Sequence, residues 1–108
     1  MDNNTSLENK IRKIEFNAIS IKDSLSKLYE PNSIEIWQNF ERKEFIRMEC
    51  RPKPGKIITL NIHEDKIHMR MNYGNYTKPF NQDYQYPNDI DLFIVDFKRN
   101  VAWESSWF

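Results

Sequence analysis

The residues best suited to chemistry in this sequence are its only cysteine and its two histidines. His63 and His68, helped by Glu64 and Asp65, are candidates to hold a metal ion, and Cys50 is a candidate nucleophile with a histidine base. A structural zinc site, however, needs four well-spaced nitrogen or sulfur ligands, and the sequence has no second cysteine or third histidine. Alternation around Cys50 places its thiol on the inward face of a strand with Ile46 and Met48, where a thiol is inert. We therefore expect no metal site, no cofactor and no enzyme activity.

A second candidate is the aromatic and acidic segment at residues 73–89, YGNYTKPFNQDYQYPND. As a loop it would be longer than most connections in a compact domain, and such loops are often functional. Tyrosine offers a large contact area with few rotatable bonds, and its hydroxyl can bond in a wet interface. The residues expected to bind a protein partner are Tyr76, Phe80, Asp83, Tyr84, Tyr86, Asp89 and Asp91. The three aspartates among them would favour a partner with a basic surface. The alternative is a loop that folds over the sheet and buries its rings.

A group of basic and aromatic residues gives an alternative surface, one for nucleic acid. Its members are Phe45, Arg47, Arg51, Lys53 and Arg70. Such side chains on a sheet can bind single-stranded RNA by stacking and charge. Glu49 interrupts the group, and the 16 Lys and Arg of the chain are balanced by 16 Asp and Glu. This balance disfavours a polyanionic partner, whose binding depends on neutralised phosphates.

Length and composition indicate one domain over residues 1–108, with residues 1–4 expected to be disordered. A lone cysteine gives no reason to expect an oxidising compartment. The start of the chain lacks the pattern of a signal peptide, and no apolar run has the length of a membrane span. We therefore expect a cytoplasmic protein that does not bind membranes. The abundance of Asn, Lys and Ile fits a bacterial source.

The first element that must position these residues is a helix. Apolar residues recur every four or three positions between residues 7 and 28, which predicts an amphipathic helix near 5–30. Pro31 ends it, because the residue before a proline avoids the helical conformation. Phe16 and Ile19 lie off the stripe and are expected to widen its apolar face. A coiled coil also fits this spacing, but we favour a helix that covers a sheet, because strands follow.

After the helix, the apolar period changes from helical spacing to strict alternation, which predicts strands. The predicted strands lie within 33–39, 44–50, 56–62, 66–72 and 90–97, and a sixth follows a turn at 98–100. Ile62 and Ile67 should face each other in a hairpin, since every apolar partner then lies on one face.

These elements predict an α+β domain in which the N-terminal amphipathic helix packs on one face of a mainly antiparallel sheet of about six strands. The expected function is a non-catalytic protein-binding module. In its size, neutral charge and helix-plus-sheet character the chain resembles bacterial immunity proteins. That resemblance implies inhibition of a cognate toxin, such as a nuclease, by blocking its cationic active site. The alternatives are an RNA-binding module and a homo-oligomeric structural subunit, which would dimerise through the helix stripe or through the side of the sheet with Trp37 and Phe45.

Overall fold

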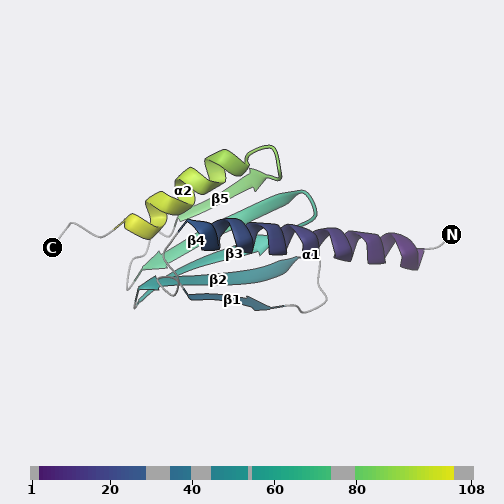
Figure 1. The fold of residues 1–108 in the computed structure, drawn as a ribbon, viewed down its shortest axis with the longest axis horizontal. Coiled ribbons are helices and arrows are strands. Elements are labelled where there is room, and N and C mark those ends of the chain that lie inside the picture. The colour runs from purple at the N-terminus through teal and green to yellow at the C-terminus, as the bar shows by residue number, and fades with distance from the viewer. Residues whose placement is uncertain (1–2, 29–34, 40–44, 54, 74–79, 104–108) are drawn as a thin grey trace.

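The protein consists of a helix, a five-stranded sheet and a second helix (Figure 1). The computed structural model describes residues 3–28, 35–39, 45–53, 55–73 and 80–103. The elements are α1 Asn3–Lys27, β1 Glu35–Asn39, β2 Ile46–Lys53, β3 Lys56–Ile62, β4 Lys66–Tyr73, β5 Phe80–Gln85 and α2 Ile90–Ala102. Each strand pairs antiparallel with the next one along the chain. The predicted α+β class, with an N-terminal helix and an antiparallel sheet, is therefore confirmed.

The central hairpin of the sheet has the predicted register. Ile62 lies opposite Ile67, and the apolar pairs continue along β3 and β4 as expected. Buried and half-buried residues alternate along the whole of β3, so one face of the sheet is in the core. The turn into β3 contains Gly55, whose φ of 82° is one that residues with a side chain rarely adopt.

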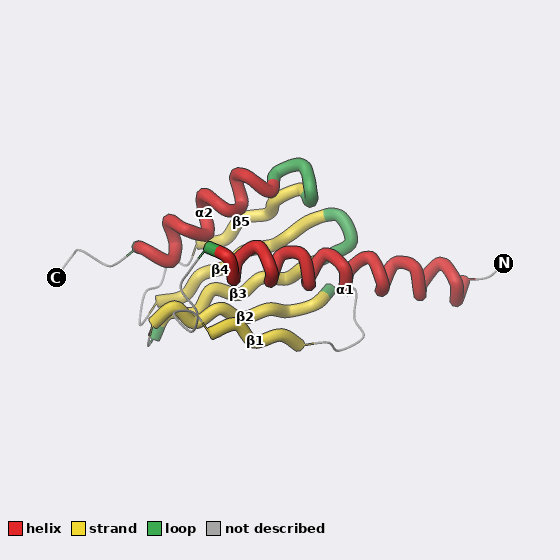
Figure 2. Tube along the Cα trace, viewed as in Figure 1, coloured by secondary structure: helices red, strands yellow, loops and turns green. Residues whose placement is uncertain are grey.

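Both helices lie on the same side of the sheet and enclose a single core (Figure 2). The buried apolar residues that they contribute are Ile14, Ala18, Ile21 and Leu25 from α1, and Phe93 and Phe97 from α2. Because Ile14, Ala18, Ile21 and Leu25 pack into the core, this part of the α1 stripe is not open to a second copy of the chain. Among the described residues, neither helix combines the length and the apolar character needed to cross a membrane.

Helix α1 is less buried than its sequence pattern predicts. The first turns of the helix extend past the sheet (Figure 1), and Leu7 at the start of the stripe is 56% exposed. Phe16 and Ile19 are 69% and 60% exposed, so they do not widen the apolar face that packs on the sheet. The reason is helical geometry: at 3.6 residues per turn, Phe16 lies on the side of the helix away from the stripe.

The strand predicted at 90–97 and the turn predicted at 98–100 are wrong, because α2 occupies these residues. Of the strand predicted after this turn, Val101 and Ala102 also belong to α2, and residues 104–108 lie outside the described part of the chain. Phe93 and Phe97 are one helical turn apart and fully buried, whereas Leu92 and Val95 are exposed. Nearly every position of this run is apolar, so its pattern fits a buried strand as well as a helix.

The segment 73–89 is not one long loop, because β5 lies within it and pairs with β4. Within the described part of the chain, the sheet therefore has five strands rather than about six. Sequence alternation did not predict β5, since Asn81, Gln82 and Asp83 are all polar and exposed and only Tyr84 is known to be buried.

Lys56 holds the C-terminal end of α2 from inside the protein. Its side chain is 1% exposed, and its Nζ donates to the carbonyl oxygens of Asn100 at 2.8 Å, of Val101 at 3.0 Å and of Trp103. The ammonium group also lies 5.9 Å from the centre of a Trp103 ring. The last carbonyls of a helix lack partners within the helix and carry the negative end of its dipole. A buried cation at this point satisfies both needs and joins α2 to β3.

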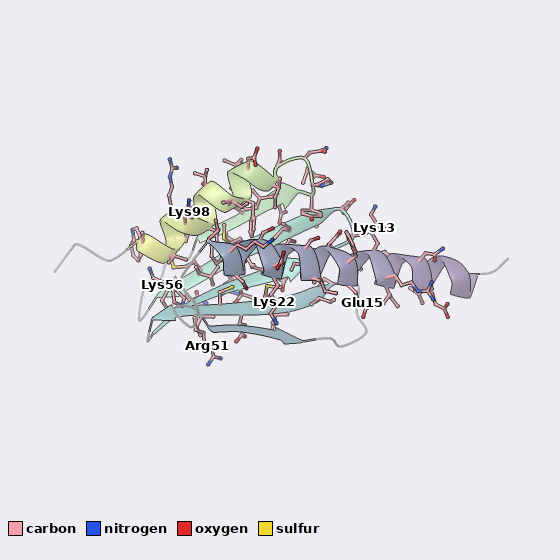
Figure 3. All side chains as sticks on the ribbon, viewed as in Figure 1. Lys13, Glu15, Lys22, Arg51, Lys56 and Lys98 are labelled. Atoms are coloured by element: carbon pink, nitrogen blue, oxygen red, sulfur yellow. The ribbon has the colours of Figure 1, made fainter. Side chains whose placement is uncertain are left out.

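Replacing Lys56 by methionine should lower the free energy of unfolding by about 2–4 kcal/mol, since buried carbonyls would lose their donor. Urea unfolding followed by circular dichroism measures this change. The matched control is Lys98→Met on the exposed side of α2 (Figure 3), with an expected effect below about 0.5 kcal/mol. Equal effects of the two variants would contradict the anchoring role.

Candidate functional site

The candidate functional surface is the side of the sheet that neither helix covers. We call it the open face and define it by the side chains of β2 to β5 that alternate with the buried ones. These are Arg47, Glu49, Arg51, Ile57, Thr59, Asn61, Lys66, His68, Arg70, Asn72, Asn81, Asp83 and Gln85. All of them are exposed or half-buried, and all but Ile57 are polar or charged.

Cross-strand pairing mixes positive and negative side chains on the open face. One row across β2 to β5 is Arg47, Asn61, His68 and Asp83, and the next is Glu49, Thr59, Arg70 and Asn81. Arg51 also forms an ion pair with Glu49, with 3.0 Å between Nη2 and Oε2. The open face therefore presents charges of both signs at close spacing, without a field of a single sign.

His68 and Asp83 form the shortest polar contact on the open face among the described residues. The two side chains lie opposite each other on β4 and β5, and His68 Nδ1 donates to Asp83 Oδ1 at 2.6 Å. This hydrogen bond is the main cause that lowers the pKa of Asp83 below its ordinary value. The sequence analysis missed the pair because it depends on the register of β5.

Asn61 has an unsatisfied acceptor beneath this row. Its side-chain Oδ1 is enclosed and has no hydrogen-bond partner among the described residues. In the row it lies between Arg47 and His68. An enclosed acceptor without a donor costs about 1–3 kcal/mol.

Tyr84 is not an anchor for a partner, and this prediction is wrong. The side chain is 1% exposed, its hydroxyl donates to Asp96 Oδ2 at 2.6 Å, and its ring meets Phe93 edge-on at 5.5 Å. Tyr86 is half-buried and packs against the core. These two rings serve mainly to join β5 and its following turn to α2 and the core.

The remaining members of the predicted partner site are spread over β5 and the start of α2. Asp83 is on the open face, and Asp91 is exposed in the first turn of α2. Asp89 is half-buried and accepts a hydrogen bond from the backbone N–H of Gln85 at 3.0 Å. Tyr76 and the side chain of Phe80 lie outside the described residues.

The structure brings together three of the residues predicted to bind nucleic acid. Arg47, Arg51 and Arg70 are all exposed on the open face. Phe45 lies just before β2, half-buried, with its ring centre 5.2 Å from that of His63. The side chain of Lys53 lies outside the described part of the chain.

The predicted burial of Cys50 is confirmed. Burial, with a smaller effect of Glu49, raises the pKa of this thiol to about 12, so it is protonated at neutral pH and a poor nucleophile. Burial is also the main cause that lowers the pKa of His63. Within the described ranges, no group of three or more His, Cys, Asp and Glu side chains could hold a metal ion.

The Tyr84 hydroxyl predicts a specific loss of stability at alkaline pH. Burial and the Asp96 carboxylate raise its pKa, so the folded state keeps the proton while the unfolded state releases it near pH 10. The stabilisation of the folded state by the protonated Tyr84 hydroxyl is therefore fully present below about pH 10 and declines above it. Tyr84→Phe should cost about 1–2 kcal/mol at pH 7, and its difference from wild type should shrink above pH 10. A difference that stays constant between pH 7 and pH 11 in urea unfolding would contradict this account.

The contact between His68 and Asp83 predicts a change in the pKa of the carboxylate. In His68→Gln, the pKa of Asp83 should rise toward the ordinary aspartate value of about 3.9, as measured by the carboxyl carbon chemical shift. His63→Gln is the control, because His63 has only a small effect on Asp83. Since the folded pKa is lowered, the contribution of the pair to stability is present above about pH 4 and is lost as the pH falls. An unchanged pKa in His68→Gln would contradict the contact.

Comparison of the chain with protein-family models, with curated protein sequences and with solved structures found no match. The function therefore has to be inferred from the geometry and charges of the open face.

Proposed function

We propose that the chain is a non-catalytic module that binds another protein through the open face of its sheet. The observation that carries this proposal is the one-sided packing of the domain. Both helices lie on one side of the sheet (Figure 2). The charged residues of four strands alternate with the buried ones and so belong to the other side. A rigid sheet gives these side chains fixed spacing, which suits recognition of a complementary surface.

The mixture of charges supports a protein as the partner. Arg47, Arg70 and Asp83 are exposed, and each has a neighbour of different charge or polarity in its row. A partner surface with the complementary pattern would be favoured, and wrong partners would be disfavoured by like charges.

The RNA-binding alternative has less support. The open face carries three arginines, but the nearest described aromatic ring, that of Phe45, is half-buried and lies against His63. One of these arginines, Arg51, is already paired with Glu49. Binding driven by phosphate contacts alone would be weak and would fall steeply with salt.

Inhibition of a toxin is the more specific form of the proposal. Support comes from the neutral charge of the small chain and from the exposed carboxylates of Asp83 and Asp91. Together with Asp89, these groups could oppose a cationic active site, although without a contribution from Tyr84. A purified partner that loses its own enzymatic activity on binding would support this role.

Charge reversal on the open face should abolish capture of the partner. Tagged wild-type protein and Arg47→Glu/Arg70→Glu would be compared in pull-downs from native cells, after ribonuclease treatment, with proteins identified by mass spectrometry. The matched control, Lys13→Glu/Lys98→Glu, makes the same charge change on exposed helix positions (Figure 3). We expect the control to retain the partner and the open-face variant to lose at least about tenfold in affinity.

Two results would contradict the proposed function. One is undiminished binding of the same protein by the open-face variant. The other is a steeply salt-dependent gel shift with single-stranded RNA that this variant abolishes, which would favour the RNA-binding alternative.

A further inference from the structure

The outer side of α1 carries a line of exposed residues that the core does not use. Its members, Arg12, Phe16, Ile19 and Asp23, follow one another at spacings of four, three and four residues. This spacing aligns side chains along one side of a helix. Phe16 and Ile19 are more than half exposed, and Arg12 and Asp23 are exposed at either end. We call these four residues the outer line.

The outer line has an apolar residue at each of its two central positions and opposite charges at its two ends. Arg12 and Asp23 are equally far from the midpoint between Asn17 and Ala18, and so are Phe16 and Ile19. An antiparallel copy of the helix would therefore bring Arg12 opposite Asp23 of the second copy, and Phe16 opposite its Ile19. We propose that two copies of this chain dimerise by antiparallel packing of their α1 outer lines.

The flanks of the helix fit the same arrangement. Figure 3 shows Lys13 on one flank of α1 and both Glu15 and Lys22 on the other. In an antiparallel pair related by a twofold axis, each flank of α1 lies beside the same flank of the second copy, with the two helices running in opposite directions. Glu15 then comes near Lys22 of the other copy, while Lys13 meets neither. Pairing of opposite charges beside an apolar seam is what sets orientation in coiled coils.

The apolar centre of this contact is small, so the dimer is weak. Two phenylalanines and two isoleucines would be covered, and so short a seam buries less than the roughly 1,200 Å² of total surface typical of stable complexes. Asp23 also contacts Lys27 within its own helix at 3.0 Å, but both groups are highly exposed. Such a pair contributes little in water and does not prevent the carboxylate from meeting a second cation. The dimer is independent of the proposed function, since the outer line and the open face lie on opposite sides of the molecule.

Charge reversal tests both the contact and its direction. The dissociation constant would be measured by sedimentation velocity over a concentration series. Arg12→Asp and Asp23→Arg should each weaken the dimer at least about tenfold, because each creates two like-charge contacts. The double variant Arg12→Asp/Asp23→Arg should recover the wild-type constant to within about threefold. Weakening by each single variant followed by recovery in the double variant is specific to antiparallel pairing. In a parallel pair Arg12 would face Arg12 and Asp23 would face Asp23, so no single variant would change the number of like-charge contacts.

A second variant tests the apolar centre without changing charge. Phe16→Ser should also weaken the dimer at least about tenfold, and circular dichroism should show an unchanged thermal midpoint. Leu92→Ser is the matched control, because this residue is exposed on α2 and should leave the dimer unaffected. A monomer at every accessible concentration, a dimer that survives Phe16→Ser, or a failure of the double charge variant to recover would each overturn the proposal.

Discussion

The buried ammonium group of Lys56 determines how the second helix sits on the sheet. It reaches from the first residue of β3 to the last carbonyls of α2. Nearer the middle of the helix, Tyr84 on β5 donates to Asp96. These two contacts join α2 to the side of the sheet that carries the core, and among the described elements neither helix covers the other side. The proposed binding surface depends on this one-sided arrangement.

The core and the proposed recognition surface therefore use alternate residues of the same strands. Met48 and Leu60 are fully buried in the core, whereas Arg47 and Asn61 in the adjacent positions belong to the open face. A polar open face is compatible with solubility until a partner covers it, because its charges are largely hydrated or paired. The outer side of α1 adds a third kind of surface, apolar at its centre and charged at its ends.

The sequence was most informative where the periodicity was unambiguous. Strict alternation around Leu60 and Met69 predicted the central hairpin and its register, which the structure confirms. The run from Ile90 to Phe97 is apolar at almost every position and so fits two periods, which is why α2 was predicted as a strand. The candidate site was predicted in part: Arg47, Arg70 and Asp83 were named, but as members of separate surfaces. Their common face depends on the pairing of β5, a strand with too few apolar residues to show a pattern.

The strict separation of the two strand faces bears on how this domain could change over evolutionary time. Substitutions at open-face positions such as Thr59 or Asn81 would alter what the surface recognises and leave the hydrophobic interior untouched. The proposed binding specificity could therefore change by single substitutions on the open face while the fold stays constant.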